Sequence, residues 1–281
     1  MSKPTKSPLS KSHGRKTISA TMTPRDLMGE SPQLKNAWRV KIVTLFPEAF
    51  PGVLGSSLTG KALQEGLWQL DTIDLRPYGE GKHRNVDDTP SGGGAGMVLR
   101  ADVVGKALEA AQQGTPSDRT KWPVIYLSPR GKPMTQAMMQ RFAKGEGMTL
   151  LCGRFEGVDE RVIEEYDIEE VSLGDFVLTG GEIAAQALID ATVRLIPRVL
   201  GNQESTEDES FSDGLLEHPQ YTRPAVWKGR TIPEMLLSGH HANISNWRQV
   251  MAERLTKKRR PDLWRAYCEE HGRDPNEDRE L

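Results

Sequence analysis

The chain has 281 residues, of which 36% are hydrophobic and 27% charged, and its formal net charge is −2. No apolar run approaches the roughly 18 residues that a membrane helix needs, which excludes a membrane-spanning protein. The two cysteines stand far apart, without CxxC or Cys/His spacing, which argues against a zinc or disulfide scaffold and for a reducing, cytoplasmic location.

Charge is distributed unevenly along the chain. Residues 1–36 hold seven Lys or Arg against two acids, among many Ser, Thr and Pro. Such a segment cannot bury enough apolar surface to order itself, so we predict a disordered basic extension over residues 1–37, with a transit peptide as the alternative. Residues 201–220 hold six acids and no Lys or Arg, whereas residues 248–265 are basic again.

The ordered part is predicted to begin at Trp38 with a buried, β-branched strand. Strands alternate with helices from there to Pro197, and a long stretch rich in Gly, Asp and Pro at 76–99 has no regular pattern. This alternation predicts a parallel α/β sheet covered by helices on both faces, in a domain of residues 38–197. The strands are predicted at 39–46, 68–75, 123–127, 148–152 and 168–173, and the helices at 57–65, 101–113, 134–144, 159–165 and 182–196.

The pattern changes after Pro197. Residues 198–220 have no periodic apolar signal and are predicted to form a mobile acidic linker. A basic helical domain is predicted over 221–270, followed by a tail at 271–281. Its first long helix, 243–259, places Ile244, Trp247, Met251 and Leu255 on one face, and Pro261 is suitably placed to begin the last helix.

Three glycine-containing loops follow predicted strands: LSPRGKP at 127–133, GRFEG at 153–157 and GDFVLTGG at 174–181. In open α/β sheets, ligands bind at the carboxyl ends of the strands, and loops without Cβ atoms let the backbone approach a ligand. The helix that begins near Glu182 adds a partial positive charge. One such loop alone would favour a simple tight turn, but three after successive strands predict a ligand pocket.

A fourth loop, GGGAGM at 92–97, superficially resembles a dinucleotide fingerprint. It does not follow a strand, and no acidic residue ends a second strand about 20 residues later, which argues against an NAD or FAD site and against the common Rossmann-type methyltransferase. A Walker A motif is absent from the sequence, which removes the P-loop interpretation.

Seven segments between about Trp38 and Pro261 closely resemble the bacterial tRNA (guanine-N1)-methyltransferase (TrmD) family of the SPOUT methyltransferase superfamily. They are LFPEAF (45–50), VDDTPSGGGAGM (86–97), IYLSPRG (125–131), LLCGRFEGVDER (150–161), SLGDFVLTGGE (172–182), SFSDGLLEHPQYTRP (210–224) and SGHHANISNWR (238–248). The resemblance implies a SPOUT-type parallel sheet with a C-terminal trefoil knot, which general topology rules disfavour, plus a small all-α C-terminal domain.

The resemblance also implies the reaction and its partners. The methyl donor would be S-adenosylmethionine, the acceptor the guanosine at position 37 of tRNA, and the enzyme a homodimer with its active sites at the subunit interface. Magnesium is associated with the family's activity, although no metal-ligand cluster is evident in this sequence. The implied donor-binding residues are Tyr126, Leu127, Ser128, Pro129, Gly153, Phe155, Glu156, Ser172, Leu173, Gly174, Asp175, Phe176, Val177, Leu178, Gly180 and Gly181.

The chemistry needs a base and a cation. Guanine N1 carries a proton, so a carboxylate that removes it generates the nucleophile, and a cation near O6 stabilises the resulting charge. The family's base is an aspartate directly before a Ser-Phe pair; here that position is Glu209, with Asp208 as the alternative. Without the resemblance, an ion pair with Asp190 at i,i+4 would explain Arg194 equally well; the match to the family's catalytic arginine favours a role in stabilising charge on the guanine.

The remaining candidates are RNA contacts, and one further departure concerns the donor loops. Tyr221, Arg223 and the basic helical domain suit contact with phosphates and splayed bases. For Asp87 and Asp88, the alternative is that they only form turns. Phe155 stands where many relatives carry Tyr. The proposed RNA-binding residues are Asp87, Asp88, Tyr221, Arg223, His240 and Arg248.

Two other functions compete with this one. A SPOUT enzyme for ribosomal RNA or another tRNA position would not need the QYTRP segment at 220–224 or the long acidic linker. A tRNA-binding protein without catalysis would explain the change to Glu209, but it would not need intact glycine loops or Arg194.

Overall fold

The computed structural model describes residues 37–200 and 209–276. The predicted basic extension lies, except for its last residue, outside the described residues, as does much of the predicted linker. No helix in the described ranges is long and apolar enough to cross a bilayer.

A five-stranded sheet forms the centre of the α/β part, and its strand order is β2-β1-β6-β5-β7. Every strand pairs in parallel with its neighbours, which confirms the predicted sheet. The strands are β1 (Trp38–Thr44), β2 (Trp68–Asp74), β5 (Val124–Pro133), β6 (Gly147–Cys152) and β7 (Glu169–Ser172).

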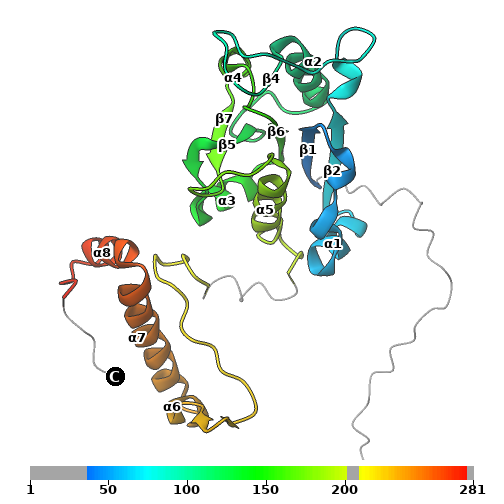
Figure 1. Cartoon of the computed structure of the whole chain (residues 1–281). Coiled ribbons are helices and arrows are strands. Elements are labelled where there is room, and N and C mark those ends of the chain that lie inside the picture. The colour runs from blue at the N-terminus through cyan, green and yellow to red at the C-terminus, as the bar shows by residue number, and fades with distance from the viewer. Residues whose placement is uncertain (1–36, 201–208, 277–281) are drawn as a thin grey trace, which may run out of the picture. The chain divides into compact units, whose positions relative to one another are not determined.

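Helices cover the sheet through two separate cores (Figure 1). One core collects Ala62, Phe142 and Leu188 from three helices, and the other collects Leu108 and Val162 from two. The strands contribute to both cores because alternate side chains point to opposite faces. The first core involves α1 (Ser57–Gln64), α3 (Gln136–Ala143) and α5 (Glu182–Val193), and the second α2 (Ala101–Gln112) and α4 (Glu160–Glu165).

Local signals explain where several helices begin. Thr135 accepts a hydrogen bond from the Met138 amide at 3.2 Å and caps α3, and Asp159 caps α4 through the Arg161 amide at 3.1 Å. Most residues of α5 are apolar, but burial follows one face, which includes Ala185, Leu188 and Ile189, whereas Ile183 on the other face is exposed.

Short elements occupy the irregular regions between these helices and strands. The stretch 76–99, which was predicted to have no regular structure, contains a small antiparallel pair formed by β3 and β4. The short elements are η1 (Pro47–Ala49), η2 (Gly52–Gly55), η3 (Arg76–Tyr78), β3 (Asp87–Asp88) and β4 (Val98–Leu99).

The predicted end of β5 at Leu127 is wrong. Pairing with β7 resumes after an irregularity between Leu127 and Lys132, so the first glycine loop is embedded in the strand. The reason lies at Gly131, where an added Cβ would stand 2.3 Å from the amide nitrogen of Val171. Only a glycine lets the two backbones approach this closely.

The C-terminal part contains the predicted helices. It also contains a short hairpin, which was not predicted from the sequence. Its elements are β8 (Val226–Trp227), β9 (Arg230–Thr231), α6 (Glu234–Leu237), α7 (His241–Arg259) and α8 (Pro261–Glu270). The start of α8 at Pro261 is as predicted. These C-terminal elements share a small hydrophobic core, which consists of Leu215, Ala252, Trp264, Tyr267 and Cys268.

The predicted apolar face of α7 is only partly correct. Trp247 is buried, but Ile244, Met251 and Leu255 are only half-buried. The Thr256 hydroxyl accepts a hydrogen bond from the Leu216 amide at 2.8 Å, so a neighbouring segment covers a face rotated from the predicted one. The buried residues of α7 are Trp247, Val250, Ala252, Glu253 and Thr256.

Candidate functional site

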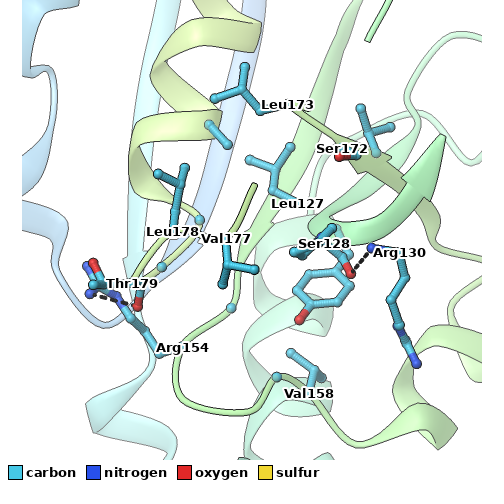
Figure 2. A pocket seen from close by; sticks show the side chains of 18 of the residues that line it. Leu127, Ser128, Arg130, Arg154, Val158, Ser172, Leu173, Val177, Leu178 and Thr179 are labelled. Carbon is cyan, nitrogen blue, oxygen red and sulfur yellow. Dashed lines mark hydrogen bonds between the residues drawn. The ribbon is translucent and has the colours of Figure 1, made fainter. Parts of the chain in front are cut away.

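A cavity of about 340 Å³ lies where β5, β6 and β7 end, within the size range of small-molecule sites (Figure 2). The three strands are neighbours in the sheet, so their loops meet at one edge. Every predicted donor-binding residue lines this cavity except Asp175, which the structure leaves outside it. The predictions missed Arg130, Arg154, Gly157, Val158, Val171, Thr179 and Ala184; Arg154 and Gly157 belong to the GRFEG motif that pointed to the site.

The cavity is lined by polar and apolar surface in about equal parts, and local hydrogen bonds hold its walls. Figure 2 shows Leu127, Val177 and Leu178 among the side chains that line the cavity. The Ser172 hydroxyl donates to the carbonyl of Gly174 and accepts from its amide, both at 3.1 Å. A ligand in this cavity would therefore meet apolar side chains and a loop with a fixed backbone.

Close approach explains two of the cavity glycines. A Cβ on Gly153 would stand 2.7 Å from the ring of Tyr126, and one on Gly181 would stand 2.8 Å from Cα of Cys152. Neither glycine has a positive φ, so the tight-turn alternative does not account for them. Burial raises the pKa of Tyr126, and it raises that of the Cys152 thiol well above its usual range.

Phe155 occupies the rim of the cavity in a strained conformation. Its φ is +59°, in the left-handed region that non-glycine residues rarely adopt, and its side chain is 55% exposed. The phenyl ring is thus accessible at the position where the sequence departs from the family's Tyr.

A buried ion pair, which sequence reasoning missed, ties two of the cavity loops together. Arg154 Nη2 lies 2.7 Å from Oε2 of Glu182, which is only 4% exposed, and Arg154 Nη1 donates to the Thr179 carbonyl at 3.3 Å. The Thr44 hydroxyl donates to Glu182 Oε1 at 2.7 Å, and the guanidinium lies 4.3 Å from the centre of the Phe46 ring. Arg154 therefore bridges the GRFEG loop and the loop that precedes α5.

We expect Glu182→Gln to destabilise the protein by about 3 kcal/mol, because the change leaves Arg154 without its buried partner. Donor affinity should fall as well, since the two loops lose their connection. Urea unfolding and calorimetric titration with S-adenosylmethionine measure the two effects. Glu146→Gln is the matched control, because the Glu146 pair with Lys121 is exposed and should contribute at most about 1 kcal/mol. Equal effects of both changes would contradict this role of Glu182.

Arg194, at the end of α5, pairs with Glu209. Nη1 lies 2.6 Å from Oε2, and Nη2 contacts the other carboxylate oxygen, which makes a two-pronged arrangement. The hydrogen bonds to Glu209 raise the pKa of Arg194. Asp190, the alternative partner, instead accepts a hydrogen bond from Thr59 at 3.1 Å. The structure thus joins the two predicted catalytic residues, whereas Asp208 lies outside the described residues.

The predicted RNA contacts lie on exposed surface of the C-terminal part. Tyr221 is exposed, with its ring edge-on to Trp247 at 6.2 Å between centroids. Arg223, His240 and Arg248 are also exposed. Their contact with RNA stays a prediction.

Asp87 and Asp88 form the short strand β3 rather than facing the cavity as lining residues. Asp88 Oδ1 accepts a hydrogen bond at 2.7 Å from the amide of Thr89, the next residue, which is one residue short of the spacing that forms a turn. Their contact with a guanine edge stays a prediction.

The fourth glycine loop, Gly92–Met97, lies against the GRFEG loop. The Glu156 amide donates to the Met97 carbonyl at 2.9 Å, and a Cβ on Gly96 would stand 2.4 Å from Cγ of Glu156. The loop therefore supports one wall of the cavity, a role that a search for nucleotide fingerprints could not reveal.

Comparisons with known proteins agree on one family. The family model described as tRNA (Guanine-1)-methyltransferase TrmD matches residues 38–266. A tRNA (guanine-N(1)-)-methyltransferase of Cereibacter sphaeroides (strain KD131) is 77% identical over 248 residues, which cover 88% of this chain and 100% of that protein. Proteins of the same name from Ruegeria sp. (strain TM1040) and Brucella ovis are 73% and 58% identical, covering 85% and 82% of this chain and 97% and 93% of theirs.

Proposed function

The chain belongs to the tRNA (guanine-1)-methyltransferase family, and from this membership we propose that it transfers a methyl group from S-adenosylmethionine to N1 of guanosine 37 in tRNA. The observation that carries the proposal is the extent of the match, which includes the cavity loops, Arg194 and Glu209 within residues 38–266. The competing function in ribosomal RNA has no support from the relatives' names.

The composition of the cavity supports S-adenosylmethionine as the donor. Its apolar side chains, such as Leu127 and Leu178, suit a planar base, and the glycine-containing loops bring backbone N–H and C=O groups to the cavity wall. When bound, the donor supplies a methyl group attached to a positively charged sulfur. Because the sulfur already carries that charge, it leaves without being protonated by an acid. The protein therefore has to supply placement, a base and a cation.

Glu209 and Arg194 are suited to those two tasks. In the proposed mechanism a Glu209 oxygen accepts the proton from guanine N1, and the electron pair freed on N1 attacks the methyl carbon. Arg194 uses two of its five N–H donors on Glu209, so others remain for guanine O6, where negative charge develops. The pair as it stands thus places a proton acceptor next to a fixed positive charge.

The chain path supports the trefoil knot that the family implies. After β7 the chain passes the neighbouring strand β5 and reaches the end of β6, where the Gly181 amide donates to the Gly153 carbonyl at 3.0 Å and Arg154 bridges to Gly180. We propose that this crossing is the threaded part of the knot, within a donor-binding domain of residues 38–197. The linker at 198–220 and a tRNA-binding domain at 221–270 are proposed on the same family ground, although the β8–β9 hairpin makes that domain mainly helical rather than all-α.

Exposed apolar side chains support a homodimer. Val53 on η2 and Ile183 on α5 are both largely exposed, and their segments touch where the Val53 amide donates to Gln186 at 3.4 Å. Leu58 of α1 is exposed as well, as are Phe176 and Val177 of the cavity loop. We propose that a second copy of the chain covers this face and so brings its own residues close to the cavity.

Magnesium is not built into this mechanism. Among the described residues, no group of three or more His, Cys, Asp and Glu side chains is arranged to hold a metal ion. No step of the proposed mechanism passes through a metal ion.

Methyl transfer from labelled S-adenosylmethionine to tRNA transcripts tests the proposal. We expect incorporation into a transcript with guanosine at position 37 and none when adenosine replaces it, because only guanine presents an N1–H to a base beside a cation at O6. Mapping the labelled nucleotide completes the measurement. Equal incorporation into both transcripts would exclude position 37 as the acceptor, and tight tRNA binding without transfer would favour a non-catalytic protein.

A further inference from the structure

The hairpin of β8 and β9 is a regular element with a defined turn. Val226 pairs with Thr231 and Trp227 with Arg230, and the Ile232 amide donates to the Ala225 carbonyl at 3.0 Å. The two turn residues, Lys228 and Gly229, have φ values of +49° and +75°. Two left-handed residues in succession characterise the tight turn that matches the natural twist of a hairpin. The side chains of this hairpin therefore have fixed directions.

Trp227 on this hairpin differs from the other tryptophans. The chain has six, of which Trp38, Trp68, Trp122, Trp247 and Trp264 are buried, whereas Trp227 is 59% exposed. Because Trp227 and Arg230 are paired directly across the hairpin, their side chains share a face. The Lys228 ammonium lies 4.9 Å from the centre of the Trp227 ring, so a large aromatic surface is presented together with two cations.

The charge around the hairpin points to an anionic occupant. Residues 221–233 contain Arg223, Lys228 and Arg230 and no Asp or Glu, although the chain as a whole has a net charge of −2. An aromatic ring flanked by cations matches a single-stranded nucleic acid, whose bases stack on aromatic side chains while its phosphates pair with Lys and Arg. An apolar protein partner would gain nothing from the uncompensated cations.

We propose that the β8–β9 hairpin is a contact site for an unpaired nucleotide of the tRNA. The base stacks on the face of Trp227 that Lys228 leaves free, and Lys228 and Arg230 contact the adjoining phosphates. The inference rests on the proposed function, because it takes tRNA as the substrate. It adds a defined site to the general expectation that the C-terminal part binds tRNA.

Equilibrium binding of an unmodified guanosine-37 transcript tests the site. We expect Trp227→Leu to raise the Kd for tRNA roughly 5- to 150-fold, the range that loss of one base–aromatic stack produces. Trp227→Phe keeps an aromatic face and should restore affinity to near that of the wild type. Lys228→Ala and Arg230→Ala should each reduce the slope of log Kd against log salt concentration by about 0.7, as expected for one lost contact to a single strand.

The controls separate this site from the overall fold and from catalysis. Lys144→Ala removes an exposed cation of the α/β part and should leave both the Kd and the salt slope unchanged. The melting temperature and the affinity for S-adenosylmethionine should be the same in all the variants. Methylating wild-type protein with an unchanged Kd in Trp227→Leu would overturn the inference and leave the proposed function intact. If the wild-type protein binds tRNA through the hairpin but does not methylate it, the proposed function is contradicted and the inference about the hairpin stands. Loss of the dimer in Trp227→Leu with unchanged tRNA affinity would also overturn the inference.

Discussion

Replacing Glu209 with glutamine should lower the rate of methyl transfer by about 10²- to 10⁴-fold, the contribution typical of a positioned proton acceptor. The amide has nearly the shape of the carboxylate and can still accept a hydrogen bond from Arg194, but it cannot take the proton from guanine N1. The affinity for S-adenosylmethionine should not change, because Glu209 does not line the cavity. Single-turnover rates at saturating donor and tRNA measure the loss.

Three further variants locate the base within the acidic segment. Glu209→Asp restores the family's residue and should retain most of the activity. Asp213→Asn is a matched control, because Asp213 accepts a hydrogen bond from the Leu215 amide at 3.4 Å and has no proposed chemical task. Asp208→Asn should likewise have little effect. A larger loss in Asp208→Asn than in Glu209→Gln would transfer the role to Asp208.

Replacing Arg194 with methionine should lower the rate about 10²- to 10³-fold, by removing the donors that stabilise charge on guanine O6. Arg194→Lys keeps the charge but cannot make the two-pronged contact to Glu209, so it should recover only part of the loss. The change should appear in kcat far more than in KM for the donor. Arg161→Met is the control, because the pair of Arg161 with Asp159 lies on the surface.

The double variant of Arg194 and Glu209 distinguishes a catalytic unit from two independent residues. Groups that act on the same proton transfer show strongly non-additive losses. We therefore expect Arg194→Met combined with Glu209→Gln to be little worse than the more severe single variant. Multiplying losses would mean that the ion pair is incidental to the reaction.

Much of the sheet and the cavity could be predicted because their signals are local. β-branched runs mark the buried strands, and parallel strands that are neighbours end at one edge, so the loops at 153–157 and 174–181 had to meet if β6 and β7 lay on either side of β5. The helix α5 could be predicted as well, because most of its residues are apolar. The resemblance to a family, rather than any spacing, identified the ligand.

The features that could not be predicted depend on contacts between distant residues. The continuation of β5 requires Gly131 to meet Val171, and the tie between cavity loops requires Arg154 to find Glu182. Burial on α7 is a similar case, because Glu253 is buried against Arg273 at 2.9 Å while Met251 stays half-exposed. The β8–β9 hairpin has only two residues in each strand, too few for an alternating pattern.

The placement of the two cysteines makes them separate reporters of local opening. Cys152 ends β6 directly beside Gly181 of the cavity wall, and Cys268 lies on α8 in a cluster with Ala252 of α7; both are fully buried, and burial raises the pKa of each thiol. Alkylating reagents attack the exposed thiolate, so modification has to wait until the surrounding structure opens. The alkylation rate of Cys152 therefore measures how often the cavity floor opens, and that of Cys268 measures separation of the two C-terminal helices. A ligand that closes the cavity slows the first rate and leaves the second as it was.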